Sequence, residues 1–240
     1  MTLFLCIDDT DEIGTKGTGE LAEELATIIE GCNWGQCSAV TRHQLYVHDD
    51  IPYTSHNSAM CFEIENHANP EAIQQLASEF LLKHAAPGSD PGLCLYQYNE
   101  QTKEALIRFG IQAKVEVLNK AQAYQVAKDN GALLTEHGGT GDGVIGALAG
   151  IGLRMQGCDG RLKGQLQLDK DQPRYTVFDL LQHPLVDRVM DQHHHSLRCD
   201  LEFELKGKLK AIRWQHQNCV ILVQENNYYH NAQKQHLKRY

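Results

Sequence analysis

The sequence has no apolar run long enough to cross a bilayer. Its longest one, residues 144–153, is broken by Gly146, Gly150 and Gly152 and falls well short of the ~20 residues that a spanning helix needs. The start of the chain also lacks the basic segment of a secretory signal peptide. We therefore expect a cytoplasmic protein with no membrane partner.

Paired cysteines and a positive net charge are missing as well. The eight cysteines include no Cys-x-x-Cys pair, which argues against a zinc ribbon and favours reduced thiols. A formal net charge of −9 excludes general attraction to nucleic acid, so RNA binding would need a local basic patch. Candidates are residues 206–213 and 234–239, with Tyr228, Tyr229 and Tyr240 as stacking surfaces. The alternative is that both runs are solvated edges.

With 240 residues, the chain is long enough for one large domain or two small ones. Strands and helices interleave early and strands cluster near the end, which predicts a mixed α/β or α+β fold. The predicted strands cover residues 2–8, 38–47, 59–65, 92–98, 132–135, 161–168, 198–206, 208–215 and 218–224. The predicted helices cover residues 18–30, 70–84, 101–109, 119–129, 143–155 and 176–190.

The first predicted strand runs directly into three carboxylates, Asp8, Asp9 and Asp11. Such a cluster is unfavourable unless a cation shares it, and carboxylates together with phosphates are typical ligands of Mg²⁺. On a strand Asp9 and Asp11 lean one way and Asp8 the other, but a turn beginning at Thr10 lets all three surround one ion. The other interpretation is an acidic turn whose side chains bond to the backbone, followed by Thr18 as a helix N-cap.

A glycine-rich loop between a predicted strand and an apolar helix is the second candidate site. Glycines let the backbone approach an anion closely, and a helix N-terminus offers it unpaired N–H groups, so phosphate is the expected ligand. No Lys-Ser or Lys-Thr follows, so the loop is not a Walker A sequence. Two alternatives stay open: a dinucleotide fingerprint at Gly141, Gly143 and Gly146 with Asp169 as ribose ligand, or glycines that serve only close helix packing. The predicted phosphate-binding residues are Gly138, Gly139, Thr140, Gly141, Asp142 and Gly143.

Three successive histidines, His193, His194 and His195, are a further candidate for metal binding. Successive residues cannot all point at one ion in regular structure, and zinc ligands follow other spacings. We therefore predict an exposed loop here.

The order and spacing of several motifs resemble the archaeal tRNA-Ile agmatidine synthetase family, TiaS. The match spans roughly residues 1–155. Its motifs are Ile7-Asp8-Asp9-Thr10-Asp11, Thr18 before the first helix, Ile51 to Ala59, Ser89-Asp90-Pro91-Gly92 and Gly143 to Ala149. That family uses ATP to attach agmatine to the wobble cytidine of an isoleucine tRNA. The resemblance implies a kinase-like domain over 1–65 and 119–240 with an inserted ferredoxin-like lobe over 66–118, and leaves open which of the two holds some C-terminal strands.

The resemblance also implies an ATP- and Mg-dependent phosphotransferase or ligase. In such an enzyme the three aspartates are catalytic and hold the metal, and Thr18 is the catalytic threonine that accepts phosphate. Lys16 or Arg42 is expected near the γ-phosphate, which needs charge neutralisation during in-line transfer. The substrate-binding residues expected from the resemblance are Arg42, His56 and Asn57.

One departure from the family pattern bears on the acceptor. Residues 54–58 read Thr-Ser-His-Asn-Ser where the family has Thr-Arg-Gly-Asn-Gly, so an arginine contact to phosphate or RNA is lost. The expected ligands are ATP and Mg²⁺, and the expected partner is tRNA or another RNA. Two alternatives are a non-catalytic nucleotide-binding regulator and a small RNA-binding module.

Overall fold

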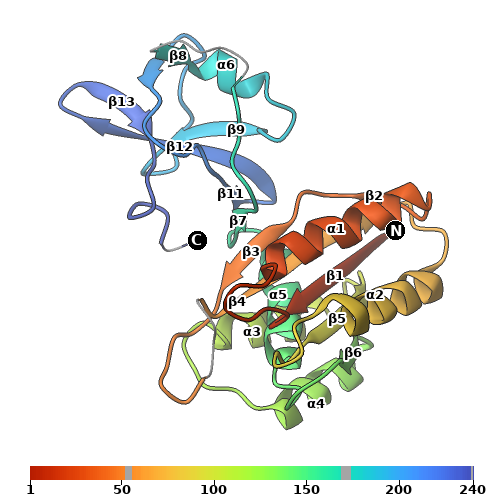
Figure 1. Cartoon of the computed structure of the whole chain (residues 1–240). Coiled ribbons are helices and arrows are strands. Elements are labelled where there is room, and N and C mark those ends of the chain that lie inside the picture. The colour runs from red at the N-terminus through yellow and green to blue at the C-terminus, as the bar shows by residue number, and fades with distance from the viewer. Residues whose placement is uncertain (52–55, 169–173, 239) are drawn as a thin grey trace. The chain divides into compact units, whose positions relative to one another are not determined.

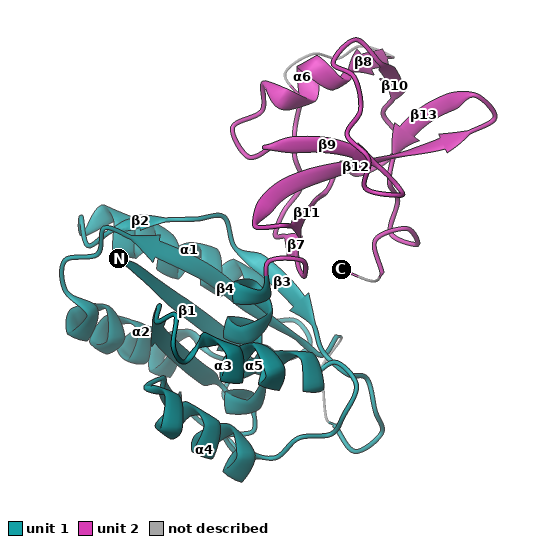
Figure 2. Cartoon of the chain, turned by 180° about the vertical axis from the view of Figure 1, so that it is seen from behind, with its two compact units in different colours: residues 1–156 teal, residues 157–240 magenta. Residues whose placement is uncertain are grey.

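The computed structural model describes residues 1–51, 56–168, 174–238 and 240. Figure 1 shows the chain, and Figure 2 colours its two compact units, residues 1–156 and residues 157–240. The structure confirms the predicted mixed α/β class. Within the described ranges, no helix is long and apolar enough to cross a membrane.

Unit 1 is built on an antiparallel sheet. Its strands are β1 (Thr2–Asp8), β2 (Gln36–Cys37), β3 (Thr41–Gln44), β4 (Ser58–Glu65), β5 (Gly92–Gln97) and β6 (Leu133–Glu136). They lie in the order β6-β5-β1-β4-β3, and β2 also pairs with β4. Its helices are α1 (Thr18–Gly31), α2 (Pro70–His84), α3 (Lys103–Gln112), α4 (Lys120–Asn130) and α5 (Gly143–Gln156).

The alternation of side chains along β1 assigns the helices to the two faces of this sheet. Leu3, Leu5 and Ile7 share a buried apolar cluster with residues of α1 and α2. Phe4 and Cys6, on the opposite face, share a second cluster with residues of α3, α4 and α5. Unit 1 therefore has three layers, with the sheet buried between two groups of helices. Asp8 continues the series of Phe4 and Cys6, so it points to the α5 side.

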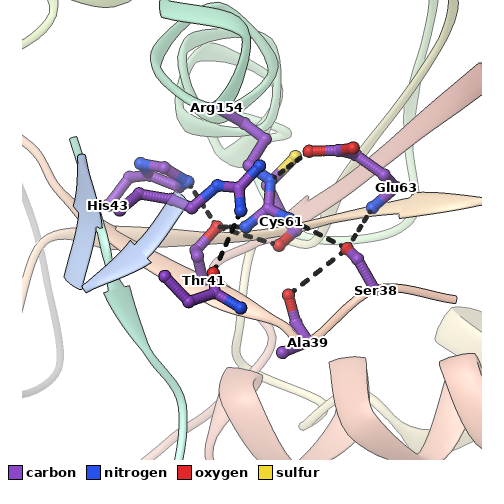
Figure 3. Close-up of polar contacts among 9 residues, drawn as sticks. Ser38, Ala39, Thr41, His43, Cys61, Glu63 and Arg154 are labelled. Carbon is purple, nitrogen blue, oxygen red and sulfur yellow. Dashed lines mark hydrogen bonds and ion pairs between the residues drawn. The ribbon is translucent and has the colours of Figure 1, made fainter. Parts of the chain in front are cut away.

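A buried ion pair anchors the C-terminal end of α5 to the sheet (Figure 3). The guanidinium of Arg154, only 2% exposed, donates to Glu63 Oε1 of β4 at 2.7 Å. It also donates to Thr41 Oγ1 at 3.0 Å and to Ser38 Oγ at 2.9 Å. Because all these partners belong to the strand side of the contact, the network fixes the position of α5 on the sheet, and with it the position of the helix start.

Unit 2 is a smaller, mostly β unit. Its elements are β7 (Arg161–Leu162), β8 (Arg174–Thr176), α6 (Val177–Leu181), β9 (Arg188–Asp191), β10 (Glu202–Glu204), β11 (Ala211–Trp214), β12 (Gln217–Glu225) and β13 (Tyr228–Asn231). The strand order is β7-β11-β12-β13-β10-β8, and β9 pairs with β12 in parallel. Met190, Ile212 and Ile221 belong to its buried core.

The predicted helix over 176–190 is wrong beyond its first turns. Helix α6 ends at Leu181, three residues before Pro184, which cannot continue a helix. The chain then forms β9, where Val189 pairs with Val220 of β12. The predicted strand 161–168 is likewise reduced to two residues, Arg161–Leu162.

The segment 66–118 does not form a separate lobe. Its strand β5 pairs with β1 on one side and with β6 on the other, so it belongs to the interior of the unit 1 sheet. Leu93 and Leu95 are buried between these neighbours and the helices. The predicted division into 1–65 plus 119–240 and 66–118 thus differs from the structure, in which unit 1 ends at Gln156.

Candidate functional site

Three loops of unit 1 meet at one end of the sheet, where β1 and β6 end and β5 begins. Asp8, the last residue of β1, pairs with Gly92, the first residue of β5. Gly92 also pairs with Glu136, the last residue of β6. Because neighbouring strands run antiparallel, the loops that follow β1, precede β5 and follow β6 emerge side by side. The structure therefore brings the predicted aspartate cluster and the predicted glycine loop to the same place.

The chain reverses immediately after β1 and then meets the start of α1. Asp9 has a φ of +50°, the left-handed region that Asp adopts more readily than most residues. Thr18 Oγ1 donates a hydrogen bond to Asp11 Oδ1 at 2.6 Å. The N-cap of α1 is Gly17, with no side-chain capping bond, so the interpretation of Thr18 as an N-cap is wrong. The Thr18 hydroxyl is instead directed at a carboxylate of the predicted site.

Carboxylates from all three loops interact electrostatically. Burial raises the pKa of Asp9 to about 6, and the nearby charges of Asp90, Asp11 and Asp142 contribute to the same rise. Burial also raises the pKa of Asp8 to about 8, with the charge of Asp9 adding to the effect. A bound cation would reduce the repulsion between these carboxylates.

Asp8 lies directly under the first turns of α5. A Cβ atom added at Gly146 would lie 1.6 Å from Asp8 Oδ2, and one added at Gly143 would lie 2.1 Å from the backbone oxygen of Asp90. These two glycines are therefore required for close packing of the helix, as one of the alternatives expected. Asp169 of the dinucleotide alternative lies outside the described residues.

The glycine loop wraps around the carboxylate of Asp90. Gly139 and Gly141 have φ values of +56° and +78°, conformations that glycine adopts without strain. The Thr140 N–H donates to Asp90 Oδ1, and the Gly143 N–H donates to the Asp90 backbone oxygen at 3.1 Å. One N–H of the loop, that of Thr140, is thus directed at an anion, and that anion is a side chain of the same protein.

A basic and an aromatic side chain of α4 hold the other side of this loop. Lys120 Nζ donates to the Thr140 backbone oxygen and lies 3.4 Å from Glu136 Oε1. Tyr124 donates to the same Glu136 oxygen at 2.8 Å. Lys120 is therefore a cation in direct contact with the loop. Of the cations predicted for the γ-phosphate, Lys16 pairs instead with Glu24 at 2.5 Å.

The predicted metal ligands do not form a complete site by themselves. Among the residues that the structure describes, no three His, Cys, Asp or Glu side chains are grouped so that they would hold a metal ion. Asp8 lies under α5, and Asp11 is hydrogen-bonded to α1. Mg²⁺, however, commonly takes only one or two carboxylates and completes its shell with water and substrate phosphates. Asp9, with Asp90 and Asp142 nearby, fits that pattern, so the metal stays a prediction.

The predicted substrate-binding residues lie around the end of β3 and the start of β4. Arg42 donates to Ser58 Oγ and to Gln44 Oε1, both at 2.9 Å. Asn57 donates to the Tyr46 backbone oxygen at 2.6 Å. His56 is exposed. Thr54 and Ser55 of the compared motif lie outside the described residues. A substrate-binding role of Arg42, His56 and Asn57 stays a prediction.

The candidates of unit 2 form local structure. The carboxylate of Asp191 accepts the N–H groups of His193 and His195, both at 2.8 Å, in a tight exposed turn, in agreement with the predicted loop. His194 stacks on Trp214 with ring centroids 3.8 Å apart. Tyr240 is 2% exposed, so it is not a free stacking surface, and that prediction is wrong for it.

Sequence reasoning assigned no role to Asp90, Glu136 or Lys120. Asp90 had a visible signal, because it stands in a Ser-Asp-Pro-Gly turn directly before a strand. Glu136 ends a strand next to the glycine loop, and its position follows once β6 is paired with β5. Lys120 has no such signal, since it reaches the loop only through the placement of α4.

No protein-family model matches the chain, and no curated protein matches it. Solved structures do match. Apo TiaS, a tRNAIle2 agmatidine synthetase, aligns with a TM-score of 0.55 and 24% identity over 63% of this chain and 35% of that one. The TiaS complex with tRNAIle2 and ATP aligns with a TM-score of 0.55 and 26% identity over 63% and 36%. A complex with tRNAIle2, AMPCPP and agmatine has a TM-score of 0.53 and 21% identity over 77% and 46%. The aligned 63–77% of the chain therefore has a TiaS-like fold, and the alignments span less than half of those proteins.

Proposed function

We propose that unit 1 binds ATP together with Mg²⁺ and transfers its γ-phosphoryl group, in a TiaS-like activity. The observation that carries the proposal is the hydrogen bond from Thr18 Oγ1 to Asp11 Oδ1 at 2.6 Å, made in the segment that holds the aspartate cluster. A hydroxyl bonded to a carboxylate is the usual arrangement of a nucleophile and its base.

The chain's own residues would divide the work as follows. Thr18 Oγ1 would attack the γ-phosphorus while the bond to the β–γ bridging oxygen breaks, its proton would pass to Asp11, and ADP would leave. The N–H groups of residues 138–142 would hold the phosphates, next to the positive end of the α5 dipole. Lys120 bonds to the loop and is therefore better placed than Lys16 to neutralise the phosphates. Mg²⁺, bound through Asp9 and its neighbours, would neutralise phosphate charge.

The TiaS complexes support this proposal, because those proteins were solved with ATP or AMPCPP and with tRNAIle2. We propose tRNA or another RNA as the second substrate. The chain covers only about a third of the TiaS chain in the 26% identical match. Nucleotide binding and the use of RNA as second substrate are therefore two separate predictions.

Calorimetric titration with ATP tests the nucleotide site. We expect binding in the presence of Mg²⁺ and its loss in EDTA and in Asp9→Asn. Asp129→Asn makes the same chemical change at an exposed position of α4 and should bind normally. Normal binding by Asp9→Asn in Mg²⁺ would overturn the metal role. ATP binding without any hydrolysis or phosphorylation, with or without added tRNA, would favour the non-catalytic regulator instead.

A further inference from the structure

The carboxylate of Asp90 is bonded to the glycine loop that is proposed to hold phosphate. Asp90 Oδ1 accepts the Thr140 N–H, and a Cβ atom added at Gly139 would lie 1.8 Å from the same oxygen. Two consecutive residues of the loop are therefore shaped around this one carboxylate. An anion that used the Thr140 N–H would have to replace Asp90 there.

The backbone of Asp90 has a second, independent hold on the loop. Its carbonyl accepts the Gly143 N–H at 3.1 Å, and a Cβ atom at Gly143 would lie 2.1 Å from that carbonyl oxygen. Because Gly143 begins α5, this contact ties the helix start to the segment that leads into β5. The backbone contact stays in place when the side chain changes, so substitutions at Asp90 test the carboxylate alone.

The charge of Asp90 also acts on the aspartate cluster. After burial, the charge of Asp90 makes the largest contribution to the raised pKa of Asp9. It exceeds the contribution of Asp11, which is only two residues from Asp9. The same carboxylate therefore accepts the Thr140 N–H and acts electrostatically on the residue proposed to bring Mg²⁺. A cation beside Asp9 would attract this carboxylate as well, and would draw it away from the loop.

We propose that Asp90 is a positioning residue that keeps the glycine loop closed to phosphate until a divalent cation is present. This inference rests on the proposed function and adds a regulation to the same site. Without the cation, the Asp90 carboxylate holds the Thr140 N–H and repels an entering phosphate. With the cation, the carboxylate turns toward the metal and releases the N–H. Binding of ATP thereby becomes dependent on the metal through a residue of the loop's own neighbourhood.

Two substitutions separate the hydrogen bond from the charge. In Asp90→Asn the amide oxygen still accepts the Thr140 N–H, but the repelling charge is gone. In Asp90→Ala both are gone. Asp142→Asn is the matched control, because it removes a charge that also influences Asp9, at a side chain that is not the acceptor of the Thr140 N–H.

The test uses calorimetry with ATP and with inorganic triphosphate, in EDTA and in Mg²⁺, on the full chain. We expect Asp90→Asn to bind both probes in EDTA roughly tenfold more tightly than wild type, the size of one nearby like charge at a partly buried site. Asp142→Asn should gain clearly less. If Asp90→Asn binds in EDTA no better than wild type, or no better than Asp142→Asn, the inference is overturned.

Amide hydrogen exchange of the ligand-free protein gives a second readout. Exchange over residues 138–142 should be faster in Asp90→Ala than in wild type and unchanged in Asp90→Asn, with the interior of α5 as internal reference. Unchanged exchange in Asp90→Ala would overturn the positioning role. The failure of the proposed function looks different: wild type would then bind neither probe even in Mg²⁺.

Discussion

Thr18 Oγ1 and Asp11 Oδ1 lie 2.6 Å apart, across the loop that joins β1 to α1. The same hydroxyl lies 3.4 Å from the Thr10 N–H, which donates to it. Thr18 is the first residue of its helix, but Gly17 is the N-cap, so the Thr18 hydroxyl does not cap the helix. The threonine is 5% exposed and its hydroxyl is held beside a carboxylate, the geometry on which its proposed role as phosphate acceptor rests.

Substitution of Thr18 separates the hydroxyl from the shape of the side chain. Thr18→Val keeps the branched shape and removes the oxygen, whereas Thr18→Ser keeps the oxygen. After incubation with ATP and Mg²⁺, intact-mass spectrometry should show one added phosphate on wild type and on Thr18→Ser, and none on Thr18→Val. Wild type that hydrolyses ATP but carries no phosphate would contradict the assignment of Thr18 as acceptor.

The buried carboxyl of Asp8 should make stability depend on pH. Burial raises its pKa from 3.8 to about 8 in the folded protein, so the folded state keeps a proton that the unfolded chain releases above pH ~4. Wild type should therefore lose stability as the pH rises from ~4 to ~8, by on the order of 5 kcal/mol for the full shift. Asp8→Asn has no such proton to lose.

Urea denaturation across this pH range, in metal-free buffer, measures the effect. Near pH 4 the variant and wild type should have similar free energies of unfolding, and the variant should become the more stable of the two toward pH 8.5. A difference between them that stays constant with pH would show that Asp8 is ionised throughout.

The Arg154–Glu63 pair (Figure 3) should be important for stability, because its guanidinium is only 2% exposed. Arg154→Met removes the buried guanidinium that donates to Glu63, Thr41 and Ser38, and we expect a loss of about 3–5 kcal/mol in the free energy of unfolding. The control is Arg174→Met, which breaks an ion pair with Glu202 whose side chains are 62% and 64% exposed. That change should cost less than ~1 kcal/mol. Equal losses in the two variants would refute the anchoring role.

Much of unit 1 was predictable because its segments have strong local patterns. The observed α2 has the predicted bounds of residues 70–84, with Pro70 at its start and Asn69 as its cap. The helix predicted over 143–155 is α5, which is one residue longer. In unit 2 the pattern was weaker. Asn226 and Asn227, both with positive φ, form the two-residue turn between β12 and β13. Two asparagines between strands favour such a hairpin turn, but the predicted elements did not include it.

By itself the sequence determined that an acidic segment follows a buried strand and that a glycine loop precedes an apolar helix, because both are local patterns of residue type. Only the tertiary structure decided what each carboxylate does. Asp8, Asp9 and Asp11 are nearly adjacent in the chain, yet one is buried under α5, one lies in a left-handed turn, and one accepts the Thr18 hydroxyl. Asp90 joins them from a loop that is far away in the sequence. The surroundings of these carboxylates differ in burial and in the charges that other parts of the chain bring near them. Both depend on strand pairing, which no local pattern specifies.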